Sequence, residues 1–164
     1  MAVPEQERDR FCRVLHESRT SLYRLALSIT RNSDDAQEAV AEAVCRAYER
    51  YPQLREKDKL PQWLLKITAN EARRLCQRRS RTVPLEDLPA EPVAPEREPE
   101  DGSLWHAVQA LSQDQREAVV LFYYEDLPTE EIARILGTTP GAVRVRLSRA
   151  REKLRSILKE GDHG

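Results

Sequence analysis

A proline-rich acidic segment divides this chain and limits what it can fold into. Residues 82–102 read TVPLEDLPAEPVAPEREPEDG, with five prolines, seven acidic residues and no helical period. Because proline favours extended backbone and like charges repel one another, this stretch is predicted to be a semi-extended linker. It separates two modules, residues 1–81 and 103–164, each with room for only a modest hydrophobic core.

The composition favours helices in both modules. Charged residues make up 34% of the chain, aromatic residues 5%, and glycine is scarce, which is more typical of an all-helical protein than of a β-sandwich or barrel. The formal net charge of −1 hides an uneven distribution. Residues 66–81 hold six basic residues against one acid, and residues 134–159 hold eight against one. Two basic blocks therefore flank an acidic linker, and each block concentrates positive potential locally.

Helical periodicity predicts three helices in the first module. Apolar residues recur at helical spacing from Leu22 to Ile29, and a second helix is expected to start with Ser33 as its N-cap. That helix should end before Pro52, because a proline pushes the preceding residue out of the helical region. Pro61 suits the first turn of a third helix, which ends in the basic run QRRSR.

Four helices are predicted in the second module. Ser103 can cap the first of them, and Ser112 with Gln115 has capping-box spacing ahead of the second. The predicted apolar face of that second helix contains Ala118, Val119, Phe122 and Tyr123.

Residues Thr129–Arg151 have the pattern of a helix-turn-helix. Ala133 is small enough for a helix crossing, Gly137 tolerates positive φ in the turn, and Val143 is placed to pack the second helix back. Thr139 is the expected N-cap of that second helix, whose exposed face should be basic. Arginine can donate two hydrogen bonds to guanine, so the motif predicts a helix that reads the DNA major groove. The alternative is an amphipathic helix with a solvated basic face.

Metal, redox and catalytic chemistry find little support in the sequence. The three cysteines are far apart and form no CxxC pair, so buried, inert thiols are preferred over a redox sensor. The three histidines are scattered, no phosphate-binding glycine loop is present, and neither a cofactor nor a metal is expected. The chain shows no membrane-spanning run and no signal peptide, so a cytoplasmic location is predicted.

Three segments, in this order, resemble the bacterial RNA polymerase sigma factors of the extracytoplasmic-function (ECF) subfamily. They are LYRLALSITRNSDDAQEAVAEAVCRAY, LPQWLLKITANEARRLCQRR and ALSQDQREAVVLFYYEDLPTEEIARILGTTPGAVRVRLSRAREKL. The resemblance implies a non-enzymatic subunit with sigma region 2 in residues 1–81 and region 4 in residues 103–164. It would bind core polymerase and direct promoter-specific transcription initiation.

The resemblance also assigns roles to individual residues. Contacts to the minus-thirty-five element would come from Thr139, Arg144, Val145, Arg146, Ser148, Arg149 and Arg151. Recognition and opening of the minus-ten element, with one base flipped into a pocket, would involve Lys57, Lys59, Asn70, Arg73 and Arg74. Docking on the clamp helices of the largest polymerase subunit would use Asp35, Glu38, Glu42 and Arg46.

Two positions depart from the family pattern, and one aromatic residue needs a separate interpretation. Val145 stands where a small polar residue is common, and Ala41 stands where a glutamine is frequent. Trp63 shares a helix face with Ile67, so it is expected in the core rather than on a base-stacking surface.

Two further expectations concern partners and arrangement. The family usually has an anti-sigma factor that clamps both modules, and without a partner the modules should move independently about the linker. The linker would approach the polymerase active-site cleft, or serve as a solvated spacer. Two other classes stay open: a stand-alone helix-turn-helix regulator with an N-terminal partner-binding module, and an RNA-binding antitermination protein. The helix that ends in QRRSR argues against both.

Overall fold

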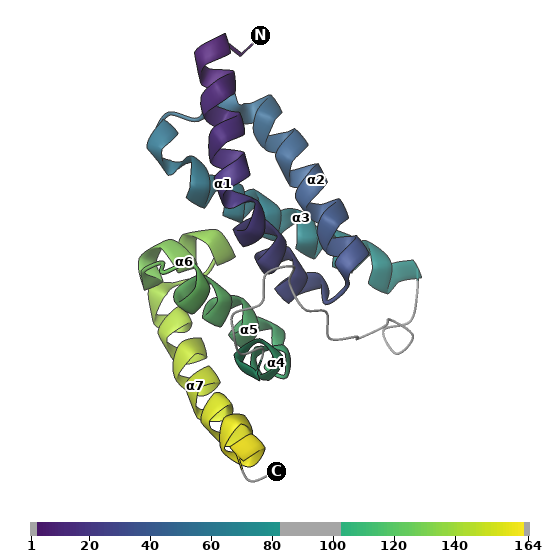
Figure 1. Cartoon of the computed structure of the whole chain (residues 1–164), viewed down its shortest axis with the longest axis vertical. Coiled ribbons are helices and arrows are strands. Elements are labelled where there is room, and N and C mark those ends of the chain that lie inside the picture. Colours follow the sequence, from purple (N-terminus) through teal and green to yellow (C-terminus); the bar gives the residue numbers. More distant parts are fainter. Residues whose placement is uncertain (1–2, 83–102, 163–164) are drawn as a thin grey trace.

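The computed structural model describes residues 3–82 and 103–162, and every regular element among them is a helix (Figure 1). The predicted all-helical class is confirmed. The predicted linker falls almost entirely on residues 83–102, which lie outside the described residues. The helices are α1 (Glu5–Thr30), α2 (Ser33–Arg50), α3 (Leu60–Thr82), α4 (Ser103–Gln109), α5 (Gln113–Val119), α6 (Thr129–Leu136) and α7 (Pro140–Asp162).

Helices α1, α2 and α3 pack against one another as the first module. The inner face of α2 is a row of small residues, Ala36, Ala39, Ala43 and Ala47, all buried. Small side chains at this spacing let the helix lie close to its neighbours. Helix α2 ends before Pro52, as predicted, and a short 3₁₀ turn, η1 (Tyr51–Gln53), follows it directly. Tyr51 nevertheless keeps right-handed helical backbone angles (φ −55°, ψ −41°), so the expected displacement of this residue from the helical region does not occur.

The N-cap predicted for α2 is one residue wrong. Asn32 occupies the cap, and its side-chain oxygen accepts a hydrogen bond of 3.0 Å from the Asp35 amide. Ser33 is the first helical residue, and its hydroxyl instead bonds Tyr23 at 2.8 Å. Both residue types cap helices well, so the composition alone did not separate them.

Helices α5, α6 and α7 form the second module together with α4. A π-helical turn, η4 (Val120–Tyr124), continues α5. Ser112 does stand at the N-cap of α5, but its side chain makes no cap hydrogen bond, so the predicted capping box does not form. The helix-turn-helix is as predicted: Gly137 ends α6 in the left-handed region at φ 68°, and α7 follows after two residues.

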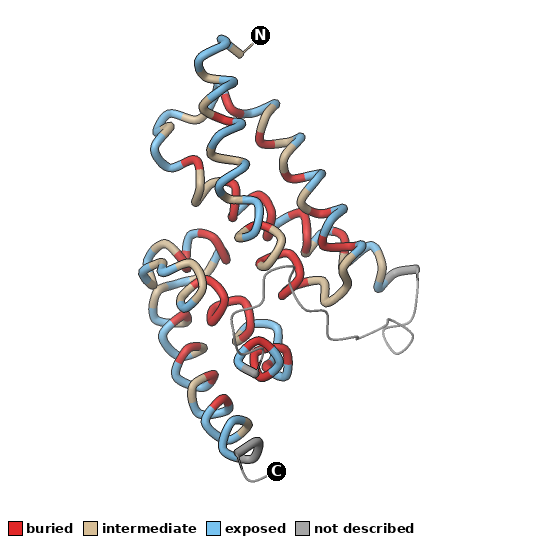
Figure 2. Tube along the Cα trace, in the orientation of Figure 1, coloured by how far each residue is buried: buried red, intermediate tan, exposed pale blue. Residues whose placement is uncertain are grey.

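The two modules are packed together rather than independent (Figures 1 and 2). Helix α1 contacts α5 and η4, while α3 contacts α6. Buried residues of both modules belong to one continuous cluster. The expectation of free movement about the linker was based on the linker alone, whereas the helices themselves supply this contact.

Charged residues make much of the contact between the modules. Arg24 lies 2.8 Å from Glu125, Arg73 lies 3.0 Å from Glu117, and Lys59 lies 3.6 Å from Glu131. In each of these pairs the first module supplies the base and the second module the acid. The buried Arg116 guanidinium also donates to the Ser28 carbonyl, and burial lowers the pKa of Arg116 to about 10.

Candidate nucleic-acid interface

Local sequence fixes the start and the inner face of α7. The Thr139 hydroxyl accepts a hydrogen bond of 3.1 Å from the Ala142 amide, so the predicted cap is confirmed. Pro140 occupies the first helical position, where its missing N–H is not needed. Val143, Leu147 and Ala150 are buried, and α7 packs through this side on α5 and α6.

The opposite face of α7 is exposed, and its N-terminal part, before Glu152, carries no acidic residue. Four exposed residues there form the α7 reading face: Arg144, Val145, Ser148 and Arg149. Thr139 is also exposed, at the N-terminal end of the same helix. The structure therefore brings five of the seven expected minus-thirty-five residues onto one accessible surface.

The remaining two expected minus-thirty-five residues, both arginines, point to the flanks of α7. Arg146 is half-buried and lies 4.0 Å from Asp114. The Arg151 Nε donates a hydrogen bond of 2.7 Å to the Tyr123 hydroxyl, and its guanidinium lies 5.6 Å from the Phe122 ring centroid. Both guanidinium groups have partners inside the second module, so they border the reading face rather than form it.

Tyr123 is a neighbour of this surface that the sequence analysis misplaced. Its predicted position on the apolar face of α5 is wrong, because the π-helical turn shifts the residues that follow Val119. Its side chain is 46% exposed, and Phe122 is half-buried. Three consecutive aromatic residues, Phe122 to Tyr124, are more than one helix face can bury, and this was the available signal.

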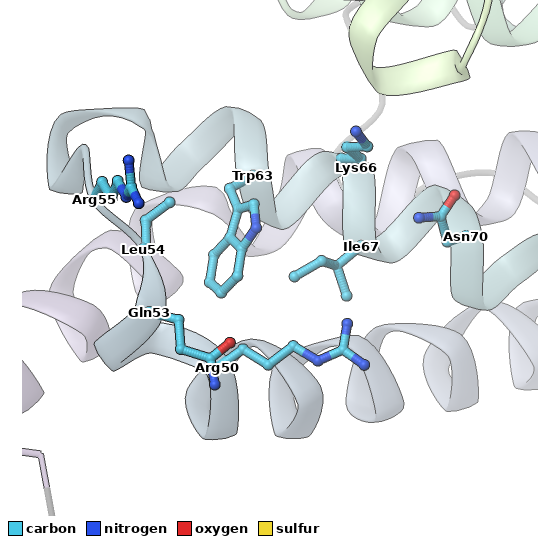
Figure 3. A pocket seen from close by; sticks show the side chains of 8 residues that line it. All are labelled: Arg50, Gln53, Leu54, Arg55, Trp63, Lys66, Ile67 and Asn70. Atoms are coloured by element: carbon cyan, nitrogen blue, oxygen red, sulfur yellow. The ribbon is translucent and has the colours of Figure 1, made fainter.

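A pocket of about 370 Å³ lies where η1 and the following loop meet α2 and α3 (Figure 3). Figure 3 shows the Trp63 ring between Leu54 and Ile67, with the Arg50 side chain along the wall formed by α2. The indole packs against the core but is only half-buried, so the prediction of a core Trp63 is confirmed in part. The lining residues are Arg50, Gln53, Leu54, Arg55, Trp63, Lys66, Ile67 and Asn70.

This pocket combines an apolar floor with positive charge. Trp63, Leu54 and Ile67 supply flat or apolar surface, while Arg50, Arg55 and Lys66 supply cations. Such a combination suits a base with its phosphate: the π-face stacks on an aromatic ring and the backbone lies along the basic groups. Of the expected minus-ten residues, only Asn70 lines it. The contribution of α2 and the loop could not be predicted from the sequence, because those residues meet α3 only in the folded module.

The remaining expected minus-ten residues have partners within the protein. The Lys57 ammonium donates to the Tyr51 carbonyl and lies 4.0 Å from the Tyr51 ring centroid. Burial, reinforced by a hydrogen bond to Glu7, raises the pKa of Tyr51 to about 12. Arg74 is exposed but lies 3.1 Å from Glu71. Lys59 and Arg73 are held by acids of the second module, as described above.

The four residues expected to contact core polymerase divide into two pairs. Glu38 and Glu42 are exposed on α2. Asp35 is buried and lies 2.6 Å from Arg79, and burial raises the pKa of this carboxyl. Arg46 lies 2.7 Å from the buried Glu71. The second pair thus ties α2 to α3, while the first pair is free to meet another protein surface.

The thiols differ from the expectation of burial. Cys12 and Cys45 are exposed, and only Cys76 is half-buried, where burial raises its pKa. Short apolar side chains are easily accommodated on a helix surface, so residue type gave no guide to position. Within the described residues, no cluster of three metal-binding side chains is found. None of the described helices is long and apolar enough to cross a membrane.

Comparison with known proteins supports both modules. The family model described as Sigma-70 region 2 matches residues 15–82, and the one described as Sigma-70, region 4 matches residues 101–154. The RNA polymerase sigma-E factor of Streptomyces coelicolor is 31% identical over 145 residues, which cover 87% of this chain and 82% of that protein. The ECF RNA polymerase sigma factor EcfG of Rhodopseudomonas palustris is 32% identical over 146 residues, covering 84% and 79% respectively.

A solved structure is similar in fold across both modules. The sigma factor RpoE from Bartonella quintana, crystallised with the anti-sigma factor NepR, matches with a TM-score of 0.77 and 27% identity. The match covers 91% of this chain and 96% of that one. A stand-alone regulator would not need region 2, whose model matches here. The chain therefore belongs to the ECF-type sigma factors, non-enzymatic proteins that direct transcription initiation by RNA polymerase.

Proposed function

We propose that this sigma factor holds promoter DNA at two points, with the α7 reading face on the minus-thirty-five element. The exposed, one-signed reading face is the observation that carries this proposal. Helix α7 has the diameter that the major groove accepts, and its N-terminal half carries the exposed Arg144 and Arg149. Arg144 and Arg149 would contact base edges or phosphates, Thr139 a phosphate, and Arg146 and Arg151 the backbone at either side.

The second point is the pocket beside Trp63, which receives a base flipped from the minus-ten element. Extruding a base costs a few kcal/mol, and stacking on an aromatic ring returns about 1–3 kcal/mol. The apolar floor and basic rim of the pocket support this assignment. Asn70 would hydrogen-bond the base edge. Lys59, Arg73 and Arg74 would follow the neighbouring strand, and Lys57 would shape the loop from within.

Docking on core polymerase is assigned to the exposed face of α2. Glu38 and Glu42 lie there on either side of the exposed Ala41. We propose that they contact the clamp helices of the largest subunit, with Asp35 and Arg46 holding α2 in place through their ion pairs with α3. The proposal also places the domain boundaries at residues 81 and 103. It further places the activity of the protein in the cytoplasm, where bacterial DNA is transcribed.

An anti-sigma partner is part of the proposal as well. The Bartonella RpoE was solved in complex with such a protein, and its likeness covers nearly the whole chain. We propose that a partner of this class holds the two modules in the packed arrangement. In that arrangement Lys59 and Arg73, two of the residues expected at the minus-ten element, form ion pairs with acidic residues of the second module.

Reconstituted transcription tests the function directly. The purified chain is mixed with core polymerase and supercoiled DNA from the same bacterium, and transcript start sites are mapped. The expected result is co-purification with core polymerase and starts at a defined set of promoters, while core polymerase alone gives none of them. Failure to bind core, or starts at random positions, would contradict the proposal.

A further inference from the structure

Val145 is an apolar side chain in the centre of a surface that is otherwise polar. It is 48% exposed, and it lies on the reading face beside Arg144, Ser148 and Arg149. Ser148 and Arg149 stand three and four residues after it, so the three side chains are direct neighbours on the helix. Single exposed apolar residues are common on protein surfaces, so exposure alone decides nothing. The position within the reading face is what distinguishes Val145.

The chemistry of the major groove offers one apolar partner. Base edges there present mainly hydrogen-bond donors and acceptors, and the one methyl group among them is the C5-methyl of thymine. Val145 can neither donate nor accept a hydrogen bond through its side chain. Against guanine, cytosine or adenine it would leave a polar group without a partner, whereas against thymine it would bury one methyl group on another.

We infer that Val145 reads the 5-methyl group of a thymine in the minus-thirty-five element, on either DNA strand. This inference rests on the proposed placement of α7 in the major groove. Arg144, Ser148 and Arg149 bracket the methyl contact with groups that bind neighbouring base edges or phosphates. Thymine at one defined position of the element is therefore selected by Val145, and the basic side chains supply the affinity around it.

Replacing thymine by deoxyuridine tests the inference, because it removes the methyl group and leaves base pairing unchanged. The upstream element is first obtained by selecting promoter duplexes that bind the holoenzyme. Each thymine of the element is then replaced singly, and holoenzyme affinity is measured by competition. For the wild-type protein one replacement should weaken binding about threefold to fivefold, the amount expected for one buried methyl group.

The variant Val145→Ala should bind thymine and deoxyuridine equally at that position, while keeping the effect of base changes elsewhere. Leu158→Ala is the matched control, because Leu158 is also exposed on α7 but lies outside the reading face, and its deoxyuridine profile should equal that of wild type. An element without thymine, or replacements whose effects do not depend on Val145, would overturn the inference and leave the proposed function standing. If no upstream element is selected at all, the proposed function fails and this inference with it.

Discussion

Arg31 adopts a backbone conformation that suits glycine better than arginine. It caps the C-terminus of α1 in the left-handed region at φ 55°. Its positive charge also contributes to lowering the pKa of the buried Arg116, and its Nε is buried without a hydrogen-bond partner among the described residues. The residue thus combines backbone strain with like-charge repulsion.

Arg31→Gly should accordingly increase the free energy of unfolding by about 1 kcal/mol. A non-glycine residue in the left-handed region costs roughly 1–2 kcal/mol, and the greater entropy of glycine in the unfolded chain offsets part of the gain. Urea unfolding followed by circular dichroism measures it. Asp126→Gly is the control: Asp126 has a similar φ of 54°, but it is exposed and aspartate tolerates the region better, so its gain should be smaller. A destabilised Arg31→Gly protein would contradict this interpretation.

Asp35 gives stability a pH dependence of known sign. Burial raises its pKa above the ordinary value of 3.8, despite the ion pair with Arg79. A carboxyl whose pKa is raised in the folded state favours folding when protonated, and that contribution is lost as pH rises through the folded-state pKa. The charged Asp35 is therefore less favourable to folding than its neutral form.

Comparing wild type with Asp35→Asn isolates this effect from other titrating groups. The unfolding free energy of Asp35→Asn minus that of wild type should increase as pH rises from about 4 to about 7. Denaturant midpoints at a series of pH values provide the measurement. A difference that moves the other way would mean that the Arg79 ion pair outweighs burial.

At the level of single elements, α2 offers a test of polymerase docking. Cys45 is exposed and stands three residues after Glu42, on the face proposed to meet the clamp helices. Cys12 is exposed on α1, outside that face. The chain thus carries a probe and its control as natural thiols.

Coupling a bulky maleimide to Cys45, in a protein with the other two cysteines replaced by serine, should reduce affinity for core polymerase at least tenfold. The same label on Cys12 alone should have little effect. Affinity is measured by fluorescence anisotropy with increasing core polymerase. Equal binding by both labelled proteins would remove α2 from the docking surface.

The elements also indicate what the sequence was able to predict. Periodicity predicted the helices of both modules, and Gly137 and Thr139 defined the turn of the helix-turn-helix, because these features depend on neighbours in sequence. The pocket was not predictable, since Arg50 and Trp63 come from different elements. The π-helical turn that moves Tyr123 outward, and the burial of Asp35 against Arg79, likewise depend on tertiary contacts.

At the scale of the whole molecule, the packed arrangement and the promoter grip exclude each other. Lys59, one of the proposed minus-ten residues, lies 3.6 Å from Glu131 of α6, the first helix of the helix-turn-helix. Promoter elements about 25 base pairs apart are separated by roughly 85 Å at 3.4 Å per base pair. The modules must therefore separate before both elements are held. No local pattern predicted this packing, because Arg116 and Glu117 find their partners in the other module.

Reversing one interface charge should loosen the packed arrangement. The Arg24 guanidinium lies 2.8 Å from Glu125 and is largely shielded from solvent. The substitution Glu125→Lys therefore places a positive charge opposite Arg24. We expect a loss of about 3–5 kcal/mol in module association, seen as reduced energy transfer between dyes placed on the two modules. The charge-swapped Arg24→Glu, Glu125→Lys protein should recover part of the transfer. No recovery would mean that the pair contributes through packing rather than charge.

The two-point promoter grip is tested most directly by one transcription assay with two variants and three templates. The variants are Arg149→Ala on the reading face and Asn70→Ala at the pocket, and the templates carry an intact promoter, an altered minus-thirty-five element or an altered minus-ten element. Arg149→Ala should lose about 1–3 kcal/mol of discrimination at the upstream element only. Asn70→Ala should lose discrimination at the minus-ten element only. If both variants weaken all three templates equally, the two surfaces do not read separate promoter elements and the account is contradicted.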